Sequence, residues 1–321
     1  MRALELVSID GPDGLRLAER LEPENGGGVR IAVRAAGVSF PDLLMSQGGY
    51  QERPELPAIL GGEVAGVVLS APEQASVRVG DRVWAAPAGG GWAEVVEVPL
   101  ERVFALPDEI SFAEGASLAV NYLTAVFALV RRGALRRGES MLVLGAAGGL
   151  GTAVVGAGAA LGAEVLAVVS TEQKAETARA AGAKRVFVGS DWTGAVREHT
   201  AGRGVALVAD IVGGENTLQA VRCTAPEGRV LVLGFTAGSI PSIATNRLLL
   251  RNVSLVGVGL GALVAVDPEV LGESAEALDR LLRAGLRPSI GATRDLADGA
   301  EALRALQRRV TLGKQILTVA D

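Results

Sequence analysis

The spacing of hydrophobic residues divides this chain into two regions. From Met1 to about Val103, the apolar stretches are short and are interrupted by Gly, Pro and Asp. Short apolar runs bounded by such turn-forming residues are typical of β-strands. We therefore predict a β-rich, barrel-like domain. Its expected strands lie at 29–33, 63–68, 81–85 and 93–98.

Beyond Pro107 the apolar residues follow a helical spacing, first over Phe112–Arg132 and then in helices that alternate with strands. Six such strands predict a doubly wound parallel sheet. Further on, helical patterns at 268–284 and 296–307 and a strand at 314–319 are expected to return to the first domain. The predicted domains are 1–112, completed by 261–321, and 113–260. The six strands are expected at 141–144, 164–169, 185–188, 205–209, 229–233 and 253–258.

Composition narrows the classes of protein. Hydrophobic residues make up 49% of the 321 residues, and we find no run of ~20 apolar residues that could span a bilayer. The start of the chain lacks the pattern of a secretory signal, so a cytoplasmic location is expected. A net charge of -5 gives no basic surface for nucleic acid or an anionic membrane, which leaves a small-molecule substrate. The 43 glycines and 3% aromatics favour an α/β protein.

The single cysteine, Cys223, and single histidine, His199, provide neither a disulfide framework nor a zinc-ligand cluster. No metal site is predicted. His199 lies in a helix-end context and is expected to be a surface residue rather than a catalyst.

A glycine-rich turn, Gly145-Ala146-Ala147-Gly148-Gly149-Leu150-Gly151, joins the first of the six strands to a helical run at 152–161. In dinucleotide sites such glycines allow a sharp turn, close approach of the backbone to a pyrophosphate and tight packing of helix on strand. Ala146 replaces the usual first glycine, so the strict pattern is broken. The strand before and the helix after still favour dinucleotide binding over a simple packing turn. The residues expected at the cofactor are Ala147, Gly148, Gly149, Leu150 and Gly151.

The second strand ends at Ser170, where NAD-selective sites place an acidic residue on the ribose 2′-hydroxyl. Ser170 cannot repel a phosphate, and Lys174 on the next helix could reach one as a point charge. This pair favours NADP(H). Against it, Glu172 has the wrong charge, and Lys174 could be a solvated helix residue.

Several further segments stand out along the chain. They are Gly48-Gly49-Tyr50 and the stretches at 35–44, 61–68, 80–83, 121–125 and 210–214. With the glycine turn, they resemble the quinone oxidoreductase and zeta-crystallin branch of the medium-chain dehydrogenase/reductase superfamily over essentially the whole chain. The resemblance implies an α/β protein with a GroES-like, β-barrel-type substrate domain built from both chain ends. Between those ends it implies a Rossmann domain with a six-stranded doubly wound sheet.

The same resemblance implies a cofactor in the interdomain cleft and a homodimer formed by pairing the last Rossmann strands, here around 253–258. Zinc alcohol dehydrogenases of this superfamily have a cysteine where this chain has Ser39 and a histidine where it has Gly62. The chain therefore resembles the zinc-free branch. Glu63 remains from that motif and is expected to make a local ion pair or hydrogen bonds.

The resemblance also assigns residues to the cofactor. Ser39 and Thr124 would approach the nicotinamide ribose or carboxamide, and Asn121 would lie in the same cleft. Arg309 and Lys314 match positions where the family often brings a basic residue near the cofactor, with a solvated surface role as the alternative. An aromatic that often follows the third strand in NADP sites is missing at 188–190. The remaining expected contacts are Ile211 and Val212 on the adenosine side, and Leu233, Gly234 and Phe235 after the fifth strand.

The implied chemistry is metal-free hydride transfer from NADPH, for which the protein mainly holds donor and acceptor at ~3–3.5 Å. Tyr50 is the candidate proton donor, since related enoyl reductases supply a tyrosine from this segment; water as donor and a packing role for Tyr50 are the alternatives. Three functions stay open. They are a quinone reductase, a reductase of enoyl thioesters or α,β-unsaturated ketones, and an NADPH-binding protein without turnover.

Overall fold

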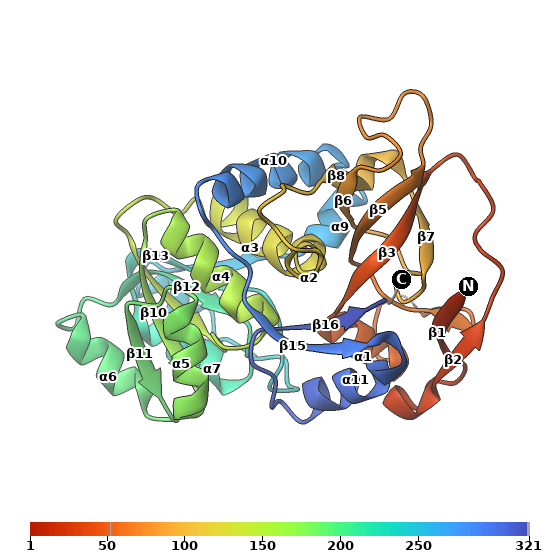
Figure 1. Ribbon diagram of the computed structural model, residues 1–321. Coiled ribbons are helices and arrows are strands. Elements are labelled where there is room, and N and C mark those ends of the chain that lie inside the picture. Colours follow the sequence, from red (N-terminus) through yellow and green to blue (C-terminus); the bar gives the residue numbers. More distant parts are fainter. Residues whose placement is uncertain (52, 320–321) are drawn as a thin grey trace. The chain divides into compact units, whose positions relative to one another are not determined.

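The two hydrophobic textures of the sequence correspond to two units in the computed structural model, which describes residues 1–51 and 53–319 (Figure 1). The first unit comprises Met1–Asn121 and Pro288–Asp321, and the second comprises Tyr122–Arg287. The boundaries predicted from the sequence, 112/113 and 260/261, differ from this division. In particular, the helix predicted at 268–284 belongs to the second unit, because it packs on a helix of that unit, α3 (Leu123–Val126).

The first unit is built on the long strand β3 (Val29–Val38), whose residues alternate between buried and partly buried as far as Arg34. This period of two is expected for a strand with one face in the core. β3 pairs antiparallel with β5 (Val64–Ser70), β7 (Val95–Val98) and β16 (Lys314–Thr318), so the end of the chain is joined to its beginning. The larger sheet has the order β15-β16-β3-β5-β6-β8, with β7 also on β3, and a small sheet has the order β2-β1-β4.

The remaining strands of this unit are β1 (Arg2–Leu6), β2 (Leu15–Glu19), β4 (Ala58–Ile59), β6 (Arg82–Ala85), β8 (Val103–Ala105) and β15 (Ile290–Asp295). Its helical segments are η1 (Gly11–Gly14), α1 (Phe40–Ser46), η2 (Leu100–Arg102), α2 (Phe112–Gly115), η3 (Leu118–Tyr122, reaching the unit boundary), η5 (Leu296–Asp298) and α11 (Gly299–Gln307).

The second unit contains six parallel strands in the order β11-β10-β9-β12-β13-β14, which confirms the predicted doubly wound sheet. Its central strands are continuous apolar runs, because a parallel sheet is covered by helices on both faces. The chain runs outward from β9 to β11 and then returns to the other side of β9, so the strand order reverses between β9 and β12. Its strands are β9 (Ser140–Leu144), β10 (Glu164–Val169), β11 (Arg185–Val188), β12 (Val205–Asp210), β13 (Thr224–Val232) and β14 (Ser254–Gly257).

Helices cover this sheet in two sets. In one, α4 and α5 contact each other and pack on β9, β10 and β11; in the other, α6 and α7 contact each other and pack on β11, β12 and β13. α4 packs closely on β9, since a Cβ at Gly158 would overlap the Met141 side chain. The helical segments of the unit are α3 (Leu123–Val126), η4 (Phe127–Arg132), α4 (Gly149–Ala160), α5 (Glu172–Ala180), α6 (Trp192–His199), α7 (Glu215–Cys223), α8 (Asn246–Leu249), α9 (Leu260–Val264) and α10 (Glu269–Arg283).

One helical stretch, Phe112–Arg132, is long and apolar enough to cross a membrane by length and composition, contrary to the expectation that no such segment exists. Of its apolar window, 72% is buried inside the protein. Mostly buried core helices pass the same test of length and composition, so this stretch is weak evidence for a membrane span.

Candidate functional site

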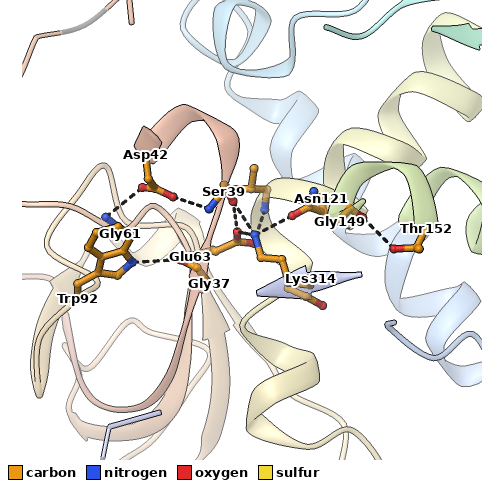
Figure 2. A network of polar contacts seen from close by, with 12 residues as sticks. Gly37, Ser39, Asp42, Gly61, Glu63, Trp92, Asn121, Gly149, Thr152 and Lys314 are labelled. Atoms are coloured by element: carbon orange, nitrogen blue, oxygen red, sulfur yellow. Dashed lines mark hydrogen bonds and ion pairs between the residues drawn. The ribbon is translucent and has the colours of Figure 1, made fainter. Parts of the chain in front are cut away.

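Four polar side chains from distant segments meet in the interior of the first unit (Figure 2). They are Ser39 before α1, Glu63 before β5, Asn121 in η3 and Lys314 at the start of β16, and we call them the Lys314 cluster. Lys314 Nζ lies 2.8 Å from Asn121 Oδ1 and 2.5 Å from Ser39 Oγ, and it also donates to Glu63. Ser39 Oγ donates to Glu63 Oε1 at 2.5 Å. Each of the three ammonium protons of Lys314 thus has an acceptor.

Strand pairing explains how these residues meet. β16 runs antiparallel to β3 with Gln315 opposite Val38, which brings Lys314 to the end of β3, where Ser39 follows. Gly37 leaves room for the acidic partner, because a Cβ there would overlap the side chain of Glu63. The other carboxylate oxygen of Glu63 accepts the backbone N–H of Val120 at 3.0 Å.

The cluster is almost fully enclosed, with Lys314 2% and Glu63 1% exposed. A buried ion pair is tolerated when its charges are close and its remaining hydrogen-bonding groups are satisfied, as they are here. The ion pair expected for Glu63 is therefore present. Of the two basic residues considered from the sequence, Lys314 is buried. Arg309 is exposed, in a turn with φ of +57°.

A cavity of about 110 Å³ adjoins Ser39 in the first unit. Its walls are mostly apolar or backbone. They are formed by Ser39, Pro41, Asp42, Met45, Pro54, Ile59, Leu60, Gly61, Gly62, Ala88, Gly89 and Val120. Tyr50 is not among the described residues that line it; it lies partly buried in a bend after α1.

Asp42, which sequence reasoning did not single out, is a buried carboxyl at this cavity, 2% exposed. Burial raises its pKa from 3.8 to about 7, although the N–H of Ser39 at 2.7 Å and the charge of Lys314 oppose the rise. Its other oxygen accepts the N–H of Gly61 at 3.3 Å. The Ser-x-x-Asp spacing at the start of a helix was the signal available in the sequence.

The glycine turn of the second unit connects β9 to the N-terminus of α4. Gly145 has a φ of +77°, a conformation that glycine adopts without strain, so the left-handed residue precedes Ala146. This explains how the chain tolerates an alanine in the usual first glycine position. Gly148 is the N-cap of α4 with open space at its Cα, whereas a Cβ at Gly151 would overlap the Gly145 carbonyl oxygen. The predicted residues from Ala147 to Gly151 therefore form a strand–turn–helix joint.

Asp210 organises the adjacent loop after β12. One carboxylate oxygen accepts the backbone N–H groups of Val212 at 3.0 Å and Gly213 at 2.9 Å, and the other accepts Thr217 Oγ1 at 2.6 Å. In the sequence, Asp210 is apparent only as the first residue of the 210–214 segment. Ile211 and Val212 follow it directly and lie beside the strand-order reversal between β9 and β12.

The loop after β13 reaches the same edge of the sheet. Ala237 N–H donates to the carbonyl of Val212 at 2.8 Å, and Thr236 N–H donates to that of Ile211 at 3.2 Å. These bonds place the predicted stretch 233–235 beside Ile211 and Val212. In open α/β sheets, ligands bind at the carboxyl ends of the strands where the strand order reverses.

Ser170 and Lys174 lie together at the end of β10, with Lys174 Nζ 3.0 Å from Ser170 Oγ. Ser170 is exposed, and Thr171 caps α5 by accepting the N–H of Lys174 at 3.3 Å. A cation and a hydroxyl thus lie together at a helix N-terminus, where anions are favoured.

The other predicted residues lie in helices of the second unit. Thr124 is partly buried in α3. His199 is exposed at the end of α6, as expected for a surface residue, and it contacts Phe187 edge-on. Within residues 1–51 and 53–319, no group of three or more His, Cys, Asp or Glu residues could hold a metal ion.

The chain is similar to known proteins over nearly its full length. Residues 149–280 match the zinc-binding dehydrogenase family, and residues 25–108 match the alcohol dehydrogenase GroES-like domain. Quinone oxidoreductase-like protein 2 of Bos taurus is 35% identical over 91% of this chain and 85% of its own length.

Two solved structures extend the similarity. A probable oxidoreductase from Mycobacterium abscessus has a TM-score of 0.92 and 40% identity over 99% of both chains. The quinone oxidoreductase of Thermus thermophilus, solved also in complex with NADPH, has a TM-score of 0.84 and 35% identity over 99% of this chain and 100% of its own. The GroES-like domain and the Rossmann-type sheet predicted from the sequence are thereby confirmed. This chain belongs to the medium-chain dehydrogenase/reductase superfamily of oxidoreductases.

Proposed function

We propose that this protein is an NADPH-dependent reductase that transfers hydride to a quinone without a metal ion. One observation carries the proposal: the glycine turn after β9 and the Asp210 loop after β12 flank the strand-order reversal, and the Ser170–Lys174 pair lies at the carboxyl end of the neighbouring strand β10. This is the place and the chemistry expected for a phosphorylated dinucleotide.

Three parts of the cofactor have residues that fit them. The amides at the start of α4 would hold the pyrophosphate, and Gly148 has the open backbone that such an approach requires. Lys174 and Ser170 fit the 2′-phosphate, while Ile211 and Val212 fit the adenosine. NADPH supplies the hydride when bound. The known NADPH complex of the Thermus thermophilus quinone oxidoreductase supports the choice of cofactor.

The acceptor side is assigned to the first unit. The mostly apolar cavity beside Ser39 suits the ring edge of a small planar acceptor, and Ser39 offers a hydroxyl to its oxygen. Gly62 has no side chain to ligate a metal, and Lys314 already supplies a positive charge next to Ser39. Both features support zinc-independent chemistry.

Parallel assays of NADPH oxidation test the proposal. We expect turnover with 1,4-benzoquinone and 9,10-phenanthrenequinone that persists after prolonged EDTA treatment. Turnover only with crotonyl-CoA would assign the protein to the enoyl thioester reductases instead. Activity that disappears with EDTA and returns with stoichiometric zinc would contradict the metal-free mechanism.

Two further parts of the proposal concern assembly and location. We propose a homodimer through β14, which ends the sheet order, because large apolar side chains near this edge are exposed: Leu249 74%, Leu250 78% and Leu255 40%. Sedimentation velocity measures the oligomeric state directly. The cytoplasmic location stays a prediction from the sequence.

A further inference from the structure

We propose that Ser39 is the proton donor of the reduction and that the buried ammonium of Lys314 resupplies its proton. This inference rests on the proposed reductase function and deepens it. It assigns the second half of the reaction, protonation of the acceptor oxygen, to residues of the first unit.

Ser39 lies where the cavity meets the Lys314 cluster. Among the described residues that line the 110 Å³ cavity, Ser39 is the member of the Lys314 cluster. Its Oγ lies 2.5 Å from Lys314 Nζ and 2.5 Å from Glu63 Oε1 (Figure 2). Ser39 therefore lies at the cavity wall and is hydrogen-bonded to the buried ammonium of Lys314. An acceptor oxygen in the cavity would meet the hydroxyl of Ser39.

The hydrogen bonds of Ser39 and Glu63 allow the Ser39 proton to turn toward the cavity. Ser39 Oγ accepts from Lys314, so its own proton is the donor toward Glu63. Glu63 keeps two other donors, Lys314 Nζ and the N–H of Val120. The Ser39 hydroxyl can therefore rotate toward an acceptor oxygen without leaving the Glu63 carboxylate unpaired. The bond from a charged donor polarises that hydroxyl, which strengthens it as a hydrogen-bond donor.

Among the described residues that line the cavity, Asp42 is the one with an ionisable side chain, and its geometry suits a structural role. One of its oxygens accepts the N–H of Ser39 and the other accepts the N–H of Gly61. Both contacts hold the loop that carries Ser39. We therefore assign Asp42 to positioning and Ser39 to proton transfer.

The reaction moves one proton from Lys314 through Ser39 to the acceptor. When hydride reaches the acceptor, the carbonyl oxygen of the acceptor becomes an anion. The O–H bond of Ser39 then breaks, and a new O–H bond forms on the acceptor oxygen. The Ser39 oxygen then takes a proton from Lys314 Nζ, which becomes a neutral amine. Lys314 regains a proton from water after the product leaves. Overall, one hydride from NADPH and one proton from water reduce one acceptor.

Kinetics of Ser39 variants provide the first test. We expect Ser39→Ala to lower kcat for a quinone by ~10²-fold or more, the range for a lost general acid, with the KM for NADPH little changed. Ser39→Thr keeps a hydroxyl and should retain most of the activity. Ser46→Ala is the matched control, because Ser46 is a buried serine of α1 whose hydroxyl donates to the carbonyl of Leu43 at 2.8 Å. It should behave as wild type.

A second readout needs neither cofactor nor turnover. The cofactor-free protein is titrated with 4-nitrophenol, whose coloured phenolate resembles the oxygen anion of the reduced acceptor. At a fixed pH, the wild type should hold a larger ionised fraction of the bound probe than exists in buffer. Ser39→Thr and Ser46→Ala should keep this increase, and Ser39→Ala should lose it. Comparable ionised fractions in the wild type and Ser39→Ala would overturn the assignment.

The two tests separate this inference from the proposed function. If the wild type reduces quinones and Ser39→Ala does so within about twofold of its rate, Ser39 is not the donor while the function stands. If the wild type oxidises no NADPH with any acceptor, the proposed function fails. The nitrophenol titration alone then decides whether Ser39 acts as the donor to an oxygen anion in the cavity. Tyr50→Phe supplies the rival outcome, because a loss of ~10²-fold there with an unaffected Ser39→Ala would assign the proton to Tyr50.

Discussion

The candidate sites of the two units are built in opposite ways. In the first unit, the Lys314 cluster is made of side chains buried below 8% exposure and joins residues 275 positions apart. In the second unit, the glycine turn consists of the backbone of a few consecutive residues. Gly148, the N-cap of α4, has open space around it. The first arrangement depends on charges that compensate each other, and the second depends on side chains that are absent. Removing a charge should therefore damage one unit, and adding a methyl group should damage the other.

The largest expected effect is on the buried ion pair. Lys314→Met leaves the Glu63 carboxylate buried without its cation, which should lower the free energy of unfolding by about 3–5 kcal/mol. Urea denaturation measures this change. The double variant Lys314→Met/Glu63→Gln should recover part of the loss, since no unpaired charge remains.

An exposed pair provides the matched comparison. Lys184 Nζ lies 3.1 Å from Glu164, with side-chain exposures of 72% and 41%. Lys184→Met should cost less than about 1 kcal/mol. Equal losses of unfolding free energy in the two Lys→Met variants would mean that burial does not increase the contribution of the Lys314 ion pair to stability.

The next effect is on cofactor affinity. Gly151→Ala places a methyl group against the Gly145 carbonyl and must distort the turn, so the Kd for NADPH should rise by ~10²-fold, or about 2.7 kcal/mol. Isothermal titration measures it. Gly272→Ala in α10 is the control, because a Cβ there meets nothing within 4 Å. If both variants bind NADPH as the wild type does, the turn does not hold the pyrophosphate.

A smaller effect is expected at the 2′-phosphate. Lys174→Ala and Ser170→Asp should each weaken NADPH binding by roughly 1–3 kcal/mol while NADH binding changes little, because only NADPH carries the phosphate. Lys184→Ala removes an exposed lysine of the same unit and should affect neither cofactor. Parallel losses for NADPH and NADH in the Lys174 variant would contradict the phosphate assignment.

The last effect is small over any single pH unit: it is a slope in the stability of the first unit with pH. Because burial raises the pKa of Asp42 from 3.8 to about 7, the folded protein holds this proton more tightly than the unfolded chain between those pH values. Stability should therefore fall as pH rises through this window, by at most about 1.4 kcal/mol per pH unit, and level off above it.

Unfolding in urea at pH 4, 5, 6 and 7 tests this slope. The Asp42→Asn variant should lack the wild-type contribution, and Asp108→Asn, an exposed carboxylate with 101% side-chain exposure, should keep it. A slope that persists unchanged in Asp42→Asn would assign it to other groups.

The sequence by itself determined what depends on neighbouring residues. Hydrophobic spacing predicted all six strands of the second unit, because a buried parallel strand is a short apolar run wherever it occurs. The glycine turn and the Ser170–Lys174 pair could also be predicted, since their contacts span six residues or fewer. Family resemblance added Ser39, Asn121 and Lys314, but as separate cofactor contacts.

Only the tertiary structure decided which of these residues meet. The antiparallel pairing of β3 with β16 joins Lys314 to Ser39 and Glu63, and no local pattern encodes a contact between such distant positions. The fold also buries Asp42, whose sequence signal was only that of a helix start. Helix α10 shows the same limit, because its amphipathic spacing predicted a helix but not that it would pack on α3 in the second unit. Periodicity specifies which face of an element is buried, whereas the partner of that face depends on how the whole chain folds.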